Sequence, residues 1–340
     1  MNIGIVYFIC LIAVVALLLV AIESGRDYST NQILLIMVMT IGNGGYCALA
    51  SSRNEDEAIL ASKLTYLIGV FVPLLLLLVV CEICNIAVNR WLKMILMTVQ
   101  VLIYGSVCTI GNLPIYYKSV EYHRENGFAY ITKTYGFMHS FYIISLIVYM
   151  IAVVVIAVRA TQQKSKVSSR NLTIIIALEF ITIATYFVER ITKTNVEMMP
   201  VANTITLFFL FKAVTRIRMY SISGNPALVD KMISSLGFIV LDTKLRYMGC
   251  NEMASRIFPE LMEWELDKKI PGSGGRFNTF LRQPMMAYIE SNSIEECQGT
   301  SFVIKENKYM YSFDTLRNKS GNVKGYIIEI KDVTTILENK

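Results

Sequence analysis

One carboxylate, Glu179, lies in the middle of an otherwise apolar stretch of the sequence. Residues Leu172 to Val188 carry no other charge, which is typical of a helix that crosses a membrane. A charged residue there costs about 2.5 to 3.5 kcal/mol on insertion scales unless it is paired or protonated. Glu179 is therefore a candidate binding residue. The alternative is a packing role, in which it forms a hydrogen bond with a Thr or Tyr of a neighbouring helix.

A second set of candidates combines charged and aromatic side chains near the ends of other apolar stretches. Its members are Glu57, Lys63, Tyr66, Tyr116, Tyr117, Tyr122 and His139. Aromatic and charged groups together can line a pocket for a small molecule. Tyrosines at a membrane surface also act as anchors without binding a ligand. Both interpretations remain open for these residues.

The residues of common catalytic sites are missing from the C-terminal third of the sequence. The only two histidines, His123 and His139, come before residue 140, so this part lacks the phosphoacceptor of a histidine kinase. It also lacks an ATP-binding glycine-rich segment and the acidic signature of a cyclase. A histidine-ligated haem is excluded there, and Cys250 and Cys297 lack the neighbours of a photoactive flavin site. We expect no enzymatic activity, no metal and no cofactor.

The candidates sit in a chain whose composition favours a membrane. Hydrophobic residues make up 54% of the 340 residues and charged residues only 17%, with a mean hydropathy of +0.49. Seven stretches approach the roughly 20 apolar residues that a spanning helix needs. They are Ile3–Ile22, Ile33–Ala50, Leu64–Cys84, Trp91–Ile110, Met138–Val158, Leu172–Val188 and Met199–Val214. The first lacks the basic start and the cleavage site of a signal peptide, so we expect it to be retained.

Charge indicates the orientation of these helices. Lys and Arg are more numerous after the odd-numbered stretches, above all between Arg159 and Arg170. Cytoplasmic loops carry such an excess, so we expect the N-terminus outside and the C-terminus in the cytoplasm. Basic and acidic residues balance after residue 225, so the net charge of +6 belongs to the apolar region. This argues against nucleic-acid binding and is compatible with contacts to membrane lipid.

A soluble domain follows the apolar region. Residues 221–227 contain Gly and Pro and are expected to be a linker, followed by a domain over residues 228–335. We predict a short helix, two strands that pair as a hairpin, a helix capped by Asn251, and three further strands. These strands are Phe238–Asp242, Arg246–Cys250, Ser301–Lys305, Lys308–Leu316 and Val323–Ile330. The predicted class is a small α+β domain with an antiparallel sheet.

The segment GFIVLDTKLRYMGCNEMASRIF, followed about 75 residues later by a hairpin and Asp332-Val333-Thr334, resembles a PAS sensory domain. Asn251 matches the Asn between strand and helix in that family. Asp332 and Thr334 match the motif that ends the last strand and starts a signalling helix, here residues 336–340. The resemblance implies that these three residues take part in signal relay.

Residues 1–220 resemble the seven-helix sensor region that precedes bacterial histidine kinases and related signalling proteins. The resemblance rests on Gly45-Tyr46, on EAILASKLTY from Glu57 to Tyr66, on Pro73, and on the segment from Tyr116 to Tyr142 with Gly136 and His139. In that family the segment forms a long outer loop and the fifth helix.

The two resemblances together imply a multi-pass receptor in a bacterial cell membrane. A small-molecule or peptide signal would shift the helices, and the PAS-like domain would relay the shift to a kinase or cyclase domain, in cis or in trans, within a homodimer. The last residues, TILENK, look like a linker helix that continues into such a domain. The alternative is a small-solute transporter or channel with a regulatory domain, although only Pro73 and Pro200 interrupt the spans.

Overall fold

The computed structural model describes residues 3–23, 28–125, 127–162, 168–192, 195–220, 236–291, 300–317 and 321–334. These residues form two compact units. The first contains Met1–Arg159 and Leu172–Thr215, and the second contains Ala160–Asn171 and Arg216–Lys340. The predicted linker 221–227, the short helix after it and the signalling helix 336–340 lie outside the described residues.

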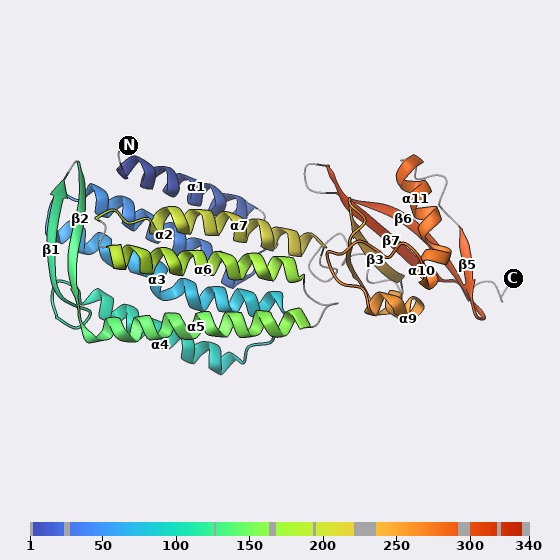
Figure 1. Cartoon of the computed structure of the whole chain (residues 1–340), viewed down its shortest axis with the longest axis horizontal. Coiled ribbons are helices and arrows are strands. Elements are labelled where there is room, and N and C mark those ends of the chain that lie inside the picture. Colours follow the sequence, from blue (N-terminus) through green and yellow to red (C-terminus); the bar gives the residue numbers. More distant parts are fainter. Residues whose placement is uncertain are drawn as a thin grey trace. The chain divides into compact units, whose positions relative to one another are not determined.

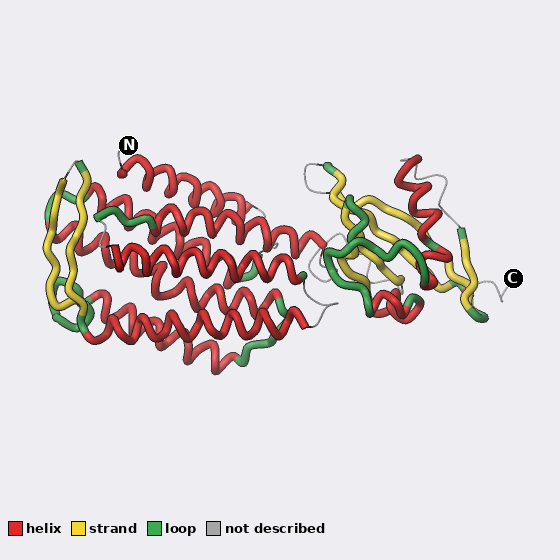
Figure 2. The backbone as a smooth tube through the Cα atoms, in the orientation of Figure 1, coloured by secondary structure: helices red, strands yellow, loops and turns green. Residues whose placement is uncertain are grey.

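The first unit is a bundle of long helices (Figures 1 and 2). They are α1 (Ile3–Glu23), α2 (Thr30–Ser51), α3 (Glu55–Ile83), α4 (Arg90–Cys108), α5 (Phe137–Gln162), α6 (Ser169–Thr192) and α7 (Met199–Tyr220). Of the described helices, α1 to α6 are long and apolar enough to cross a membrane. The helix α7 is not among them, because Asn203, Lys212 and Arg216 lower its hydropathy. A seventh span stays a prediction.

The helix α3 lies at the centre of the bundle. Every residue from Leu74 to Cys81 is buried, so other helices surround these two turns. Glycines bring α2 against α3: a Cβ atom on Gly45 would lie 2.8 Å from the backbone nitrogen of Thr65. A Cβ atom on Gly42 would lie 2.3 Å from the Ile68 side chain. Small residues of this kind let the backbones of two helices approach closely, which stabilises helix packing in a membrane.

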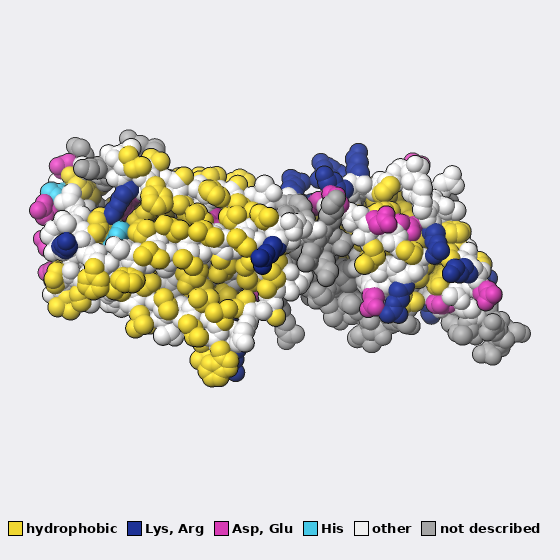
Figure 3. Space-filling view, turned by 60° about the horizontal axis from the view of Figure 1, so that its bottom comes forward, with side chains coloured by type: hydrophobic (Ala, Val, Ile, Leu, Met, Phe, Trp, Pro, Cys, Tyr) yellow, Lys and Arg dark blue, Asp and Glu magenta, His cyan; other side chains and the backbone are white. Residues whose placement is uncertain are grey.

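The outer surface of the bundle is apolar (Figure 3). Ile9, Leu60, Leu102 and Ile144 are each more than half exposed, on four different helices. Exposed apolar area on this scale marks a surface that contacts a membrane or another protein. The bundle is therefore suited to a lipid environment, as its composition predicts.

A β-hairpin connects α4 to α5, in a segment for which only a long outer loop was expected from the sequence. Its strands are β1 (Tyr117–Glu125) and β2 (Phe128–Tyr135), which pair antiparallel. The expectation missed the Asn126-Gly127 pair, a strong signal for a two-residue turn between strands. Gly127 has a φ of 83°, which such a turn requires and which glycine adopts without strain.

The second unit contains a five-stranded antiparallel sheet in the order β4-β3-β7-β6-β5. The strands are β3 (Leu236–Asp242), β4 (Tyr247–Cys250), β5 (Ser301–Ile304), β6 (Asn307–Arg317) and β7 (Val323–Asp332). Between β4 and β5 come α9 (Glu252–Ile257), a 3-10 turn (Pro259–Met262), α10 (Gly275–Phe280) and α11 (Arg282–Ser291). The sheet and these helices share an aromatic core that includes Phe258, Phe277 and Phe313. The five predicted strands and the antiparallel sheet are confirmed to within two residues at each end.

Asn251 holds the start of this sheet together. Its side-chain oxygen accepts hydrogen bonds from the backbone N–H groups of Phe238 (2.8 Å) and Ala254 (3.0 Å). Its side-chain nitrogen donates to the Leu236 carbonyl at 2.7 Å. One side chain thus caps α9, as predicted, and also fixes β3.

We expect Asn251→Ala to lower the free energy of unfolding of the second unit by about 2 kcal/mol, because it removes the partner of two buried backbone N–H groups and of the Leu236 carbonyl. The check is denaturant unfolding of the full chain in detergent, followed by the fluorescence of Trp264. Asn307→Ala is the control, since Asn307 is exposed at the start of β6 and should change the value by less than about 0.5 kcal/mol. Equal effects of the two substitutions would contradict the prediction.

Candidate functional site

The hairpin end of the bundle contains a cluster of aromatic side chains, called here the tyrosine cluster. It consists of Tyr66, Tyr116, Tyr117, Tyr135, His139, Tyr142 and Tyr186. These residues come from α3, the hairpin with the residue before it, α5 and α6. Tyr66 is at the centre, with ring centroids 5.0 Å from Tyr116 and 5.9 Å from both Tyr117 and Tyr142. The Tyr117 hydroxyl donates to the Tyr66 hydroxyl at 2.5 Å.

His139 is the buried histidine of the cluster. Its ring lies 4.0 Å from Tyr135 and 5.5 Å from Tyr116, measured between centroids. Its Nε2 atom is 3.4 Å from the Tyr186 hydroxyl, at the long end of hydrogen-bond geometry. His139 of α5 therefore contacts the hairpin side through its ring and α6 through the long polar contact with Tyr186.

Two ion-pairing residues border the cluster. Lys133 of β2 lies 3.2 Å from a carboxylate oxygen of Glu197, which precedes α7. The two side chains are only 21% and 28% exposed, so water screens this pair less than a surface pair. The Lys133 ammonium also lies 5.9 Å from the ring centroids of Tyr66 and Tyr117. This is within the range of a cation–π interaction.

Burial sets the protonation of the groups on the hairpin side. Burial raises the pKa of Tyr117 well above its usual value, and the neighbouring Tyr66 adds to the shift. Burial also raises the pKa of Tyr116, so both hydroxyls stay neutral and can donate hydrogen bonds. For Lys133, burial acts to lower the pKa, but the Glu197 carboxylate and the neighbouring Tyr66 together outweigh it, and the net shift is upward. Lys133 is thus charged at neutral pH.

The structure brings four predicted site residues into the cluster, Tyr66, Tyr116, Tyr117 and His139, and leaves three others outside. The Glu57 carboxylate accepts from the Arg53 N–H at 2.8 Å and from the Asn54 side chain at 3.1 Å, so it belongs to the cap of α3. Tyr122 donates to the Ser52 carbonyl at 2.9 Å and ties the hairpin to the end of α2. The Lys63 side chain has no hydrogen bond or ion pair with any described residue.

Glu179 lies apart from the cluster, inside the bundle. It is 6% exposed, and its Oε2 atom is buried without a hydrogen-bond partner among the described residues. One turn further along α6, the Thr182 and Thr206 hydroxyls are 3.0 Å apart and join α6 to α7. Thr182 thus forms a hydroxyl contact between the two helices, while binding and packing both stay predictions for Glu179.

Sequence reasoning missed Lys133, Tyr135, Tyr142, Tyr186 and Arg190 as members or neighbours of the cluster. Lys133 and Tyr135 alternate along β2, so a strand assignment would have placed them on one face. Tyr142, Tyr186 and Arg190 lie at the hairpin end of α5 and α6. Arg190 was counted only for membrane orientation, because its partner, the Tyr135 ring, is distant in sequence.

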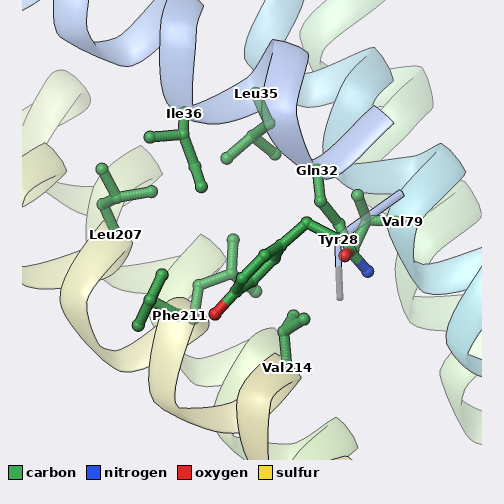
Figure 4. Close-up of a pocket in the computed structure, with 9 residues that line it drawn as sticks. Tyr28, Gln32, Leu35, Ile36, Val79, Leu207, Phe211 and Val214 are labelled. Atoms are coloured by element: carbon green, nitrogen blue, oxygen red, sulfur yellow. The ribbon is translucent and has the colours of Figure 1, made fainter. Parts of the chain in front are cut away.

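The bundle also contains two spaces away from the cluster. A cavity of about 20 Å³ between α2, α3 and α7 has room for roughly one water molecule (Figure 4). Tyr28 projects into it and stacks on Phe211, with its hydroxyl 2.8 Å from that of Thr215. A groove of about 400 Å³ between α1 and α7 is lined by apolar surface, including Leu17 and Phe208. The first is too small for an organic ligand, and the second suits hydrocarbon.

The first unit and its hairpin match a known family over residues 2–223, the N-terminal 7TM region of histidine kinase. This match covers well over half of the 340 residues. The chain belongs to this family. The resemblance drawn from Gly45-Tyr46, Glu57–Tyr66 and Tyr116–Tyr142 is thereby confirmed. A comparison with curated proteins finds no match.

The family assignment gives the 7TM region a coarse function as a sensor in membrane signalling. The sheet of the second unit lies outside the matched residues, and the predicted relay residues in it form structural contacts. Asp332 accepts from the N–H and the hydroxyl of Thr334 at 3.0 and 2.6 Å. The Thr334 hydroxyl in turn accepts from the Lys308 N–H at 3.0 Å. Together with Asn251, these residues hold the first and last strands, and their relay role stays a prediction.

Two carboxylates of the 7TM region, the buried Glu179 and the exposed Glu82, provide a test of a carboxylate without and with hydrogen-bond partners. Glu179→Leu should raise the free energy of unfolding by about 1 to 3 kcal/mol, because it removes a buried oxygen without a partner. Glu82→Leu should lower it, because Glu82 accepts from the Ser29 hydroxyl at 2.6 Å and from the Asn31 side chain. Thermal unfolding in nanodiscs measures both. A loss of stability in Glu179→Leu would show that the carboxyl has a favourable partner.

The Lys133–Glu197 pair should stabilise the protein up to alkaline pH. The pKa of Lys133 is raised in the folded protein. The stabilisation by the charged lysine is therefore complete below the pKa of an unfolded lysine, about 10.4, and is lost as pH rises through the pKa of Lys133 in the folded protein. Lys133→Met should therefore cost about 2 kcal/mol at pH 8, with the difference from wild type shrinking above pH ~10.4. Unfolding temperatures across this range check it. A difference that does not change with pH would count against the pair.

Proposed function

We propose that the chain is the sensory part of a membrane receptor that detects its signal at the tyrosine cluster. The observation that carries this proposal is the set of contacts that the start of α7 makes with other elements. Glu197 pairs with Lys133 of the hairpin, and its carbonyl accepts from the Tyr7 hydroxyl of α1 at 2.6 Å. Glu189 of α6 accepts from the N–H groups of Met198 and Met199, at 2.9 Å for the latter.

These contacts make α7 the route of the signal. A ligand that moves the hairpin or α6 changes the partners of Glu197 and Glu189, and so displaces the start of α7. The same helix continues in sequence into the second unit, to which it belongs from Arg216 onward. A receptor of this kind needs two packing states that bind the ligand differently. Tyrosine rings that contact four elements at one end supply such a packing.

For the second unit we propose a PAS domain that relays the shift. Support comes from the antiparallel sheet with its helices between the second and third strands, and from Asn251, Asp332 and Thr334 at the positions of the family pattern. Thr334 lies two residues after the end of the last strand, so a movement of that strand would also move the chain that follows it. The output would be a histidine kinase or cyclase domain, in cis or in trans, and the described residues would have no catalysis of their own.

The hairpin would lie outside the bacterial cell membrane and the second unit in the cytoplasm. The basic residues between Arg159 and Arg170 support this orientation, since they follow the fifth helix on the side of the second unit. We propose a homodimer surrounded by lipid, as PAS-containing receptors generally form, and no contact with nucleic acid.

If the proposal is correct, a small change in the tyrosine cluster alters hydrogen exchange in the sheet of the second unit. Tyr66→Phe removes the hydroxyl that accepts from Tyr117, a bond of about 1 kcal/mol, which would shift a two-state equilibrium about fivefold. We expect altered hydrogen–deuterium exchange in peptides 236–250 and 323–334 of the full chain in nanodiscs. Tyr104→Phe is the control, because the Tyr104 hydroxyl donates to the Lys63 carbonyl outside the cluster. Unchanged exchange in Tyr66→Phe would refute the relay, and solute uptake by proteoliposomes would instead favour transport.

A further inference from the structure

Arg190 stacks on an aromatic ring at the edge of the tyrosine cluster. Its guanidinium carbon lies 3.4 Å from the centroid of the Tyr135 ring, so the charged group covers the face of the ring. Tyr135 is itself fixed by His139 at 4.0 Å and by Tyr117 at 5.5 Å. A guanidinium held over a ring presents its N–H donors sideways, as a planar fork that fits a carboxylate or phosphate.

The acidic residues near Arg190 already have other partners. Glu197 pairs with Lys133 at 3.2 Å, and Glu189 accepts from the backbone at the start of α7. The described residues include no carboxylate within ion-pair distance of Arg190 and no acceptor for its N–H groups. Burial and the Arg190 charge both act to lower the pKa of Lys133, which shows that the two cations act on one another. Among the described residues, this half-buried cation thus has no counter-ion.

The surroundings of Arg190 can hold more than a bare ion. Tyr186 lies one turn earlier on the same face of α6, and its ring is 6.4 Å from that of Tyr142. Arg190, Tyr135 and Tyr186 are all partly exposed, whereas His139 beneath them is buried. Aromatic walls with one convergent charge are typical of sites for small organic molecules. Basic side chains are visible at this end of the bundle in Figure 3.

We propose that Arg190 binds the oxyanion of an organic anion, a carboxylate or a phosphate, whose remaining atoms lie against Tyr135 and Tyr186. The inference rests on the proposed function, since it names the chemical class of the signal. The oxyanion can belong to a soluble organic acid or to the head group of a lipid, because both offer the planar acceptor pair that the fork fits.

The test uses the full chain in a maltoside detergent, which contains neither carboxylate nor phosphate. Benzoate and phenyl phosphate are titrated at constant ionic strength, with benzamide as the neutral analogue, and the unfolding temperature and heat of binding are recorded. A separate series adds phosphatidylglycerol. The variants are Arg190→Lys, which keeps the charge but loses the fork, and Arg190→Gln, each first checked for a wild-type unfolding temperature without ligand.

We expect saturable stabilisation by at least one of the two anions and none by benzamide. Arg190→Lys should weaken binding about tenfold or more, because a lysine lacks bidentate geometry. The control Arg124→Lys, in an exposed hairpin position, should bind as wild type does. An Arg190-dependent effect of phosphatidylglycerol alone would assign the oxyanion to lipid.

Equal binding by wild type and Arg190→Lys, or equal effects of benzoate and benzamide, would overturn the proposal, as would the absence of any effect. Failure of the receptor function is recognised separately. In that case the anions would still bind in an Arg190-dependent way, but hydrogen exchange in peptides 323–334 would not respond to them or to Tyr66→Phe.

Discussion

The enclosure of α3 by the other helices is the constraint on which the rest of the bundle depends. Between Leu74 and Cys81 this helix offers no surface to lipid, so its position is set by packing alone. At its other half, a Cβ on Gly69 would lie 2.6 Å from the Tyr142 hydroxyl, so this glycine makes room for the cluster. Pro73, four residues later, has no N–H to bond the Gly69 carbonyl. Helix α3 is thus weakest beside the tyrosines, where a change in packing has most effect.

Two sets of polar groups in the 7TM region differ in how they are bonded. At the hairpin end, Tyr66, Tyr117, Lys133 and Glu197 have partners from different elements, so a movement of one element breaks bonds in another. Inside the bundle, Glu179 has an oxygen without a hydrogen-bond partner among the described residues. Exchange of partners is what a two-state sensor needs. This physical difference supports the proposal that the signal is sensed at the hairpin end and not at Glu179.

The sequence predicts elements well where one periodic signal decides them. Apolar runs predict α1 to α6, and alternation predicts β3 to β7 to within two residues at each end. It predicts the site only in part, because contacts such as Arg190 with Tyr135 join residues distant in sequence. Glu57 shows the converse error: its charge indicates binding, but its position three residues after Asn54 makes it part of a helix cap. The hairpin could have been predicted from the Asn126-Gly127 pair in the sequence, but a loop was expected there instead.

The low hydropathy of α7 supports its proposed role in the relay. It is less apolar than its neighbours, so lipid contact contributes less to holding it in place. Its first turn depends on Glu189 and Glu197, two carboxylates supplied by α6 and by the residue before Met198. Since Arg190 directly follows Glu189, an anion bound at Arg190 would act next to the residue that caps α7. The proposed anion site at Arg190 and the cap of α7 at Glu189 would then lie in the same turn of α6. A signal would not need a long path through the bundle to reach α7.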